Sequence, residues 1–420
     1  ALLIPCLGIS QIINKVITKS ETERIERVLA SDEMEGRRTF TPSIDKAAAF
    51  IAKEFEATGL KSMKGDNNFL QSFSINRPKF ISLSATIDGS VIDTKQVIVV
   101  TIEPEIKITE ATGYTVAKIA AGENLNQAAA KMIGSNQKMI VFVDESHAQN
   151  FGRLVRFKNN LASNQATVVF VLTNTTPVKY AIQASHQIET MALANVVAMI
   201  PGKTLPNEYV IFSGHYDHLG INAKNMVNGD SIYNGANDDA AGTTAMIMLS
   251  KYYKALNNNA RTIIFAAFTA EEAGGYGAQY FSKQLDPNKV VAMFNIEMIG
   301  TESKWGKNSA YITGFDKTNM GAILQKNLDG SSFKFYPDPY TEQNLFYRSD
   351  NATLARLGVA AHTISTSKMD SEPNYHKASD QIETLDLDNM NEIIKAIALS
   401  AGSIIAGKDT PTRVDTTQLK

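Results

Sequence analysis

The stretch Ile263-Ile264-Phe265-Ala266-Ala267-Phe268 is an uninterrupted apolar run that ends shortly before an acidic pair, Glu271-Glu272. Two further runs have the same form: Tyr209-Val210-Ile211-Phe212 leads into His215, and Val290-Val291-Ala292-Met293-Phe294 leads into Glu297. Near-continuous apolar strands are buried on both faces, so the three runs predict a sheet covered by helices on both sides. Such sheets place their sites beyond the carboxyl ends of the strands, where each run leads into a metal-binding side chain.

Helical periodicity surrounds these strands. Two amphipathic helices are expected between Ser20 and Leu60, the second closed by Gly59. Further helices are expected at residues 240–256, 276–285, 319–328 and 387–405. The predicted fold class is therefore α/β, a three-layer α/β/α sandwich with a mixed, mostly parallel central sheet.

Between these parts the texture of the sequence changes to β-branched runs separated by polar loops, which predicts an inserted strand-rich module. We expect a lead at residues 1–19, a discontinuous α/β domain at 20–68 and 196–408, an inserted domain at 69–195, and a tail at 409–420. The charged, Thr-rich tail is expected to fray.

The first ten residues, Ala1 to Ser10, are apolar and uncharged and are similar to the end of a secretory signal, so we exclude these ten residues from the fold. A buried N-terminal strand or helix is the alternative, because the basic start of a signal is absent. The single cysteine, Cys6, rules out intrachain disulfides. These features favour an exported protein, secreted or periplasmic.

Composition narrows the function classes. The chain has 420 residues, 44% of them hydrophobic, with 41 basic against 43 acidic side chains. This balance is that of a soluble globular protein and does not favour nucleic acid as a partner. No run of about 18 apolar residues predicts a membrane span. Oligomeric state is left open.

His215-Tyr216-Asp217 lies at a predicted strand end, where side chains two residues apart point the same way. The Asp217 carboxylate can therefore contact the second imidazole nitrogen and fix its tautomer for metal binding. A satisfied core histidine is the alternative. His218 lies beyond the strand end and is expected to support the site at most, and His147, His186 and His362 are expected to be structural or surface residues.

Asp238-Asp239 occurs in a polar turn directly before a predicted helix, where acidic residues otherwise serve as N-caps. We expect Asp238 to bridge two metal ions and Asp239 to orient the backbone.

Glu271 and Glu272 follow a wholly apolar strand, and two carboxylates at that depth need cations nearby, unless the segment is a solvated loop. Adjacent side chains diverge, so Glu272 is assigned as a ligand and Glu271 as the general base.

Glu297 is a second buried acid at a strand end, and His376 supplies the last imidazole, with Asp380 able to cap the next turn or support the site. The donor set of two imidazoles and several carboxylates suits two divalent ions roughly 3.5 to 4 Å apart.

Together these motifs resemble the co-catalytic di-zinc peptidases, the family that includes secreted bacterial aminopeptidases and glutamate carboxypeptidase. The resemblance covers about residues 20–65 and 195–405, including the lead-in Leu29-Ala30-Ser31-Asp32-Glu33-Met34-Glu35-Gly36-Arg37. The middle segment resembles the protease-associated domain that many members carry as an insertion.

The resemblance implies two zinc ions per chain and peptide substrates. It implies that Asp238 is shared by both ions, Glu272 and His376 bind one, and His215 and Glu297 bind the other. Family members usually have aspartate where Glu297 stands, so the extra methylene can move that ion. Catalysis would use a metal-bridging hydroxide with Glu271 as the base and Asp217 in support. Ser349-Asp350 also matches a family motif near the substrate pocket.

Aminopeptidase action, the release of N-terminal residues, is the leading activity expected. A carboxypeptidase or dipeptidase of the same family is the main alternative, and Arg348, Tyr340 and Tyr347 lie in a stretch that could line its pocket, with Arg348 able to hold a carboxylate. Glutaminyl-peptide cyclase, with one zinc, and a metal-free receptor-like protein are the other readings.

Overall fold

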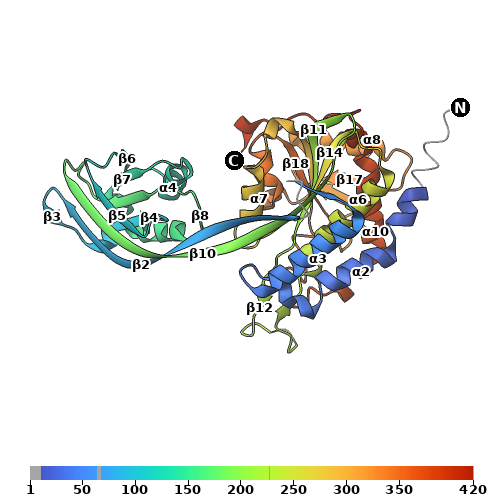
Figure 1. Cartoon of the computed structure of the whole chain (residues 1–420), viewed down its shortest axis with the longest axis horizontal. Coiled ribbons are helices and arrows are strands. Elements are labelled where there is room, and N and C mark those ends of the chain that lie inside the picture. The colour runs from blue at the N-terminus through green and yellow to red at the C-terminus, as the bar shows by residue number, and fades with distance from the viewer. Residues whose placement is uncertain (1–10, 64–67, 227, 420) are drawn as a thin grey trace. The chain divides into compact units, whose positions relative to one another are not determined.

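The computed structural model describes residues 11–63, 68–226 and 228–419, which form two compact units (Figure 1). The main unit combines the chain up to Ser72 with the chain from Leu193 onward, and the inserted unit is Phe73–Ala192. Each unit has its own hydrophobic core.

The main unit is built on a mixed sheet. Its strands lie in the order β17 (Lys334–Pro337), β16 (Ser309–Ile312), β18 (Ala360–Ser365), β15 (Val290–Ile296), β11 (Leu205–His215), β14 (Arg261–Phe268) and β10 (Tyr180–Ile200), with β1 (Lys61–Ser62) beside β10. The central strands β18, β15, β11 and β14 pair in parallel, whereas β10 and β16 join antiparallel. Their carboxyl ends therefore meet at one edge.

Helices cover both faces of this sheet (Figure 1). On one side lie α2 (Lys19–Leu29), α3 (Pro42–Thr58), α6 (Ala241–Leu256), α8 (Met320–Asn327) and α10 (Leu387–Ser400), continued by α11 (Gly402–Ile405). On the other side lie α7 (Tyr276–Ser282) and α9 (Asn351–Ala355). Because Phe212 packs with the first set and Ile211 with the second, the strands are buried on both faces, and the predicted α/β/α sandwich is confirmed.

Local sequence signals set the helix ends. The Thr18 hydroxyl accepts the Glu21 N–H at the start of α2, and Gly59 closes α3 at φ 71°, as predicted. Residues 11–19 of the expected lead, which follow the excluded apolar segment, belong to the main unit. Residues 11–16 are helical, and Ile13 and Ile17 are buried in the main core. The apolar segment Ala1 to Ser10 lies outside the described residues.

The C-terminal segment does not fray as expected. Val414 is buried, the Thr412 N–H donates to Asn319, and the Arg413 guanidinium donates to the carbonyls of Pro287 and Val290. These contacts tie the segment to the main unit because they satisfy backbone carbonyls beside β15.

The inserted unit contains a four-stranded sheet in the order β4 (Val97–Val100), β9 (Val168–Leu172), β7 (Met139–Val143) and β6 (Thr115–Ile119). It also holds β2 (Leu70–Ile87), β3 (Ser90–Val91), β5 (Glu105–Thr109), β8 (Leu161–Ala162), α4 (Leu125–Gly134) and α5 (Ala148–Phe151). Strands β2 and β10 continue between the units, so the insertion leaves and re-enters the main unit on strands. The pattern agrees with the strand-rich texture of the sequence.

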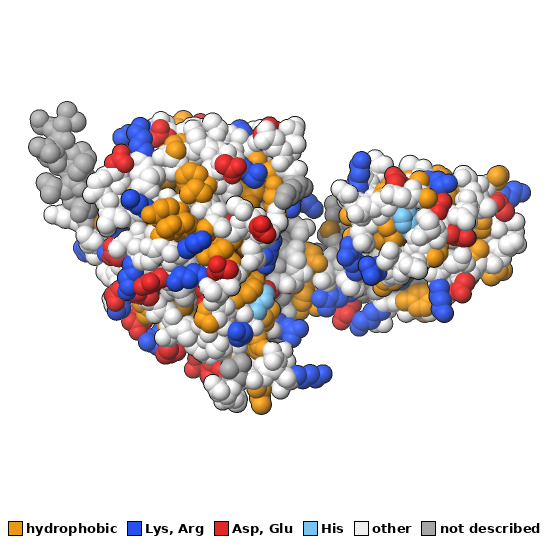
Figure 2. All heavy atoms as spheres, turned by 180° about the vertical axis from the view of Figure 1, so that it is seen from behind, with side chains coloured by type: hydrophobic (Ala, Val, Ile, Leu, Met, Phe, Trp, Pro, Cys, Tyr) orange, Lys and Arg blue, Asp and Glu red, His pale blue; other side chains and the backbone are white. Residues whose placement is uncertain are grey.

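On the face of each unit that Figure 2 draws, basic and acidic side chains are interspersed. Among the described helices none is long and apolar enough to cross a membrane.

Candidate metal and active site

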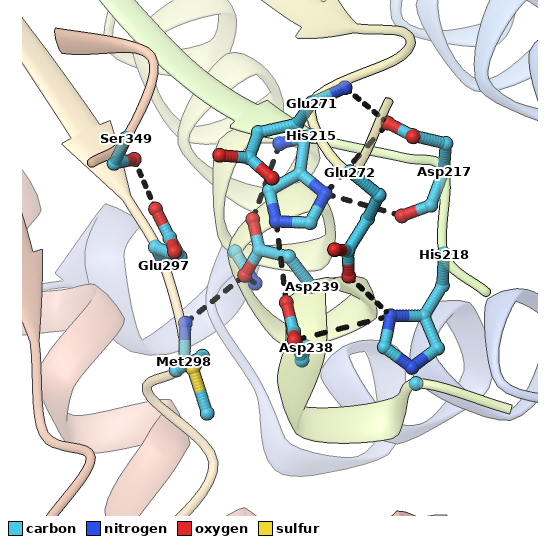
Figure 3. Close-up of polar contacts among 12 residues, drawn as sticks. His215, Asp217, His218, Asp238, Asp239, Glu271, Glu272, Glu297, Met298 and Ser349 are labelled. Atoms are coloured by element: carbon cyan, nitrogen blue, oxygen red, sulfur yellow. Dashed lines mark hydrogen bonds and ion pairs between the residues drawn. The ribbon is translucent and has the colours of Figure 1, made fainter. Parts of the chain in front are cut away.

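The predicted ligands lie together beyond the carboxyl ends of the parallel strands (Figure 3). His215 ends β11, Glu271 and Glu272 follow β14, and Glu297 follows β15. Asp238 lies in a tight turn before α6, where the partial positive charge of a helix N-terminus favours an anion. His376 comes from the loop before α10. A two-stranded ribbon, β12 (Gly220–Ile221) and β13 (Ile232–Tyr233), separates His215 from Asp238 along the chain.

One candidate centre is formed by His215, Asp238 and Glu297, whose ligand atoms lie within 4.8 Å of one another. His215 Nε2 is 3.2 Å from Asp238 Oδ1. These are the residues that the family resemblance assigns to one ion together with the shared aspartate.

The second candidate centre also uses Asp238. His376 Nε2 is 3.2 Å from Asp238 Oδ2 and 3.2 Å from Glu272 Oε1. His218 Nδ1 lies 2.9 Å from the same Glu272 oxygen and 3.9 Å from Asp238 Oδ2, so His218, Asp238 and Glu272 also form a compact donor group. Asp238 thus faces three imidazoles, which come from two segments of the chain.

His218 was expected to support the site at most, and it contacts the predicted ligand Glu272 directly. The signal for this was in the sequence: His218 follows the strand-end motif His215-Tyr216-Asp217 by one residue. What the sequence did not show is the β-bridge between Arg38 and His218. The His218 ring is buried beside Glu272.

Asp217 contacts the imidazole differently from the prediction. His215 Nδ1 is 3.1 Å from the Asp217 backbone carbonyl and 3.8 Å from the Asp217 carboxylate. The Nδ1–H therefore donates to the carbonyl, which leaves Nε2 free to bind a cation. The Asp217 carboxylate instead accepts the Glu271 N–H at 3.0 Å and the Thr39 hydroxyl at 2.9 Å. It positions the backbone of the predicted base.

Asp239 and Asp380 hold backbone rather than other side chains. The Asp239 carboxylate accepts N–H groups from Gly242 and Met298 at 3.0 Å and from His215 at 3.2 Å. Asp380 accepts the N–H groups of Asn237 and Asp238 at 2.9 and 3.0 Å. The backbone of the turn that carries Asp238 is therefore held by hydrogen bonds to both Asp239 and Asp380.

A chain of hydrogen bonds supports Glu297. The Ser349 hydroxyl donates to Glu297 Oε2, and Asn295 Nδ2 donates to Ser349 Oγ at 2.7 Å. Asn295 Oδ1 in turn accepts the Ser213 hydroxyl at 2.7 Å. Sequence reasoning placed Ser349 near the pocket but did not find Ser213 or Asn295, whose roles depend on the pairing of β11 with β15.

Several site residues adopt left-handed backbone conformations. Ala270 before Glu271 has φ 59°, Met298 after Glu297 has φ 54°, and His376 itself has φ 56°. Non-glycine residues rarely adopt this region, and such strain concentrates at functional sites because the surrounding contacts impose it.

The acids repel one another. Burial, together with Glu297, Asp350 and Glu272, raises the pKa of Glu271 well above its ordinary value. Burial and the charge of Asp238 likewise raise the pKa of Glu297. Burial also opposes ionisation of Asp238, but the nearby imidazoles of His215 and His376 outweigh it and hold the Asp238 pKa low.

The donor set fits divalent cations. Asp238 Oδ2 and His215 Nε2 are buried without a hydrogen-bond partner of normal geometry among the described residues. Imidazole nitrogens and carboxylate oxygens are the ligands that zinc prefers outside thiolate sites. Cations here would also offset the repulsion among the buried carboxylates.

A pocket of about 520 Å³ of atom-free space, partly open to solvent, lies over this cluster. Its floor carries Asp238, Glu271, Glu272, Glu297 and His376, and its walls include Tyr311, Leu345, Met369, Tyr375 and Arg348. Of the three residues expected to line it, Arg348 does. Tyr340 instead packs edge-to-face on Tyr311, and Tyr347 packs on Phe346.

The three histidines expected to be structural or surface residues, and Asp350, are not among the ligands of the two candidate centres. His362 is buried between the Thr313 carbonyl and the Thr318 hydroxyl, His147 contacts the Ala120 carbonyl, and His186 lies in the inserted unit. Asp350 is buried next to Ser349 with neither carboxylate oxygen hydrogen-bonded within the described chain, and burial raises its pKa to about 8.

A mixed α/β sheet whose carboxyl ends gather buried imidazoles and carboxylates beneath a pocket is the arrangement of an α/β protein with a candidate metal-binding active site. Comparison with known families then specifies it further. Residues 195–401, nearly half of the chain, match the model of peptidase family M28, and this part of the chain belongs to that family.

Curated relatives have related names. The chain is 29% identical over 211 residues to a probable leucine aminopeptidase of Trichophyton verrucosum, covering 48% of this chain and 54% of that protein. It is 26% identical over 254 residues to leucine aminopeptidase 1 of Paracoccidioides brasiliensis, covering 56% and 62%. The aligned part of this chain thus spans a little over half the length of these relatives.

Solved structures share the fold over nearly the whole chain. An aminopeptidase from Aneurinibacillus sp. superposes with a TM-score of 0.55 at 15% identity, covering 97% of this chain and 98% of that one. A zinc aminopeptidase from Bacillus subtilis gives a TM-score of 0.54 at 15% identity, covering 96% and 97%. At these identities the likeness concerns the fold.

Proposed function

We propose that this protein is a zinc-dependent aminopeptidase that binds two zinc ions and uses Glu271 as general base. The observation that carries the proposal is the position of Asp238, a buried carboxylate approached at 3.2 Å by His215 from one side and by His376 from the other. Residues His215 and Glu297 would hold one ion, and Glu272 and His376 the other. His218 contacts Glu272 and would orient it.

Bound zinc would polarise a scissile carbonyl and lower the pKa of an attacking water. Glu271 would accept the proton of that water as it attacks, and would then deliver it to the leaving amine nitrogen. Asp217 would keep Glu271 in place through the backbone N–H.

The charge of the pocket supports cleavage at the N-terminus. Its floor is rich in carboxylates, which would attract a substrate α-ammonium group. Several curated relatives are named leucine aminopeptidases. Arg348 on the pocket wall supports the competing direction, because its exposed guanidinium could bind a C-terminal carboxylate.

Matched substrates test this direction. The protein is expected to release nitroaniline from leucine nitroanilide and not from the N-acetylated compound, because blocking the amine removes its charge and its fit to the acidic floor. Initial rates on both compounds measure this, with a peptide bearing a free C-terminus and a blocked N-terminus as the control. Hydrolysis of the blocked peptide alone would make the protein a carboxypeptidase.

Metal content tests the number of ions. Purified protein is expected to carry about two zinc ions per chain and to lose hydrolysis when a chelator removes them, with recovery on zinc addition. Elemental analysis before and after chelation measures this. About one ion per chain, with ring closure of N-terminal glutamine instead of hydrolysis, would indicate the cyclase reaction.

Two further proposals concern the rest of the chain. The strand-rich inserted unit is proposed to be a protease-associated-like domain. Export is proposed from the apolar segment at residues 1–10, and an M28 peptidase precursor of Shewanella amazonensis has a similar fold, with a TM-score of 0.51 at 14% identity over 97% of this chain and 98% of that one.

A further inference from the structure

We propose that Arg37 is a positioning residue that holds the two loops carrying His215, His218 and Asp238 in the geometry needed for metal binding. The inference rests on the proposed function of the site. Arg37 touches neither the pocket nor the predicted ligands, and it acts through the backbone of the segments that carry them.

The Arg37 side chain is fully buried and donates only to backbone carbonyls. Its Nε–H donates to the Tyr216 carbonyl at 2.8 Å, and its two terminal nitrogens donate to Leu29 at 2.6 Å, Asn234 at 2.5 Å and Gly235 at 2.9 Å. Within the described chain it forms no ion pair. A buried guanidinium devoted to four carbonyls is unusual, because an arginine at such depth is normally paired with an acid.

The four carbonyls belong to segments far apart in sequence. Tyr216 lies between His215 and Asp217, whereas Asn234 and Gly235 begin the turn that places Asp238. Leu29 ends α2, which packs against α6 in the main core. The Arg37 guanidinium therefore connects the His215 loop to the Asp238 loop and anchors both to the end of α2.

The residues next to Arg37 strengthen this connection. The His218 N–H donates to the Arg37 carbonyl at 3.3 Å, and the Thr39 hydroxyl donates to the Asp217 carboxylate at 2.9 Å. Gly36 lies so close to the ribbon that an added Cβ would be 2.3 Å from the Tyr233 carbonyl. The lead-in segment is thus pressed against both ligand loops.

The charge of Arg37 also matters. The guanidinium lies in the field of Glu26, Asp380, Asp217 and Asp239, which favour its charged form against the cost of burial. It is a permanent cation beneath an acid-rich site, independent of the metal ions. Lysine would retain the charge, but its three donors on a flexible stem cannot reproduce a planar fork that reaches four carbonyls.

The test compares R37K with R261K. Arg261 is the control because it is also buried and donates to the carbonyls of Ile404 and Asp409, although it also pairs with Glu208; it begins β14, at the end of the strand opposite Glu271. Zinc affinity is measured by competition with a chelator, and the visible spectrum of the cobalt(II)-loaded protein reports ligand geometry.

R37K is expected to bind zinc roughly 10- to 100-fold more weakly than wild type and to show an altered cobalt spectrum, as loss of outer-sphere support does at other metal sites. R261K is expected to keep both readouts unchanged even if its melting temperature falls equally. A folded R37K with wild-type affinity and spectrum would overturn the proposal, whatever its stability.

If R37K does not fold, G36A is the second variant, because it displaces the lead-in segment without changing any charge. It is expected to weaken zinc binding and alter the spectrum in the same sense, and wild-type values would overturn the proposal. Failure of both variants to fold would assign the segment to folding instead. A wild-type protein that binds no zinc would refute the proposed function itself, and the positioning role with it.

Discussion

Substitution D238N is expected to empty both metal centres and abolish hydrolysis. The Asp238 carboxylate faces His215 and His376 at once, both at 3.2 Å, and the amide that replaces it is a poor ligand that cannot offset the charge of two cations. Zinc content is expected to fall from about two ions per chain toward zero, since both sites lose a charged ligand. Elemental analysis and the rate on leucine nitroanilide measure the two effects.

The outer ligands provide the controls. Glu297 belongs to the centre with His215, and Glu272 belongs to the centre with His376. The E297Q and E272Q proteins are therefore each expected to lose about one zinc ion per chain. A D238N protein that retains two ions would show that Asp238 does not bridge. Loss of one ion only would place the aspartate in a single centre.

Substitution E271Q is expected to leave zinc content unchanged and to lower kcat by roughly 10²- to 10⁴-fold, the usual contribution of a general base. Figure 3 shows the carboxylates of Glu271 and Glu272 pointing apart. Of these two glutamates, Glu272 is the one that contacts the imidazoles of His218 and His376. Glutamine keeps the shape and the backbone hydrogen bond to Asp217 but cannot accept the proton.

The adjacent variant E272Q is the matched comparison, because it changes the same chemical group one residue away. We expect E271Q to lose turnover with its metal retained, and E272Q to lose metal. KM for E271Q is expected to change little, since the base acts in the chemical step. Wild-type kcat in E271Q would remove Glu271 from the mechanism, and loss of zinc would make it a ligand.

Much of this architecture follows from local sequence. The continuous apolar runs predicted strands buried on both faces, and Phe212 and Ile211 do face opposite helical layers. Parallel pairing of those strands follows from their helical connections, and it brings His215, Glu271 and Glu297 to one edge. The error lay at the C-terminal tail, where Val414 is buried although the composition indicated fraying.

Local sequence determined the elements and the strand ends that carry ligands, because periodicity and strand burial depend on neighbouring residues. Tertiary structure alone decided which atoms meet: the Asp217 carboxylate contacts the Glu271 backbone instead of the imidazole, His218 reaches Glu272, and Arg37 joins loops nearly 200 residues away. The last of these contacts has no local signal, since its acceptors are backbone carbonyls that every residue carries and only the folded chain brings them within reach.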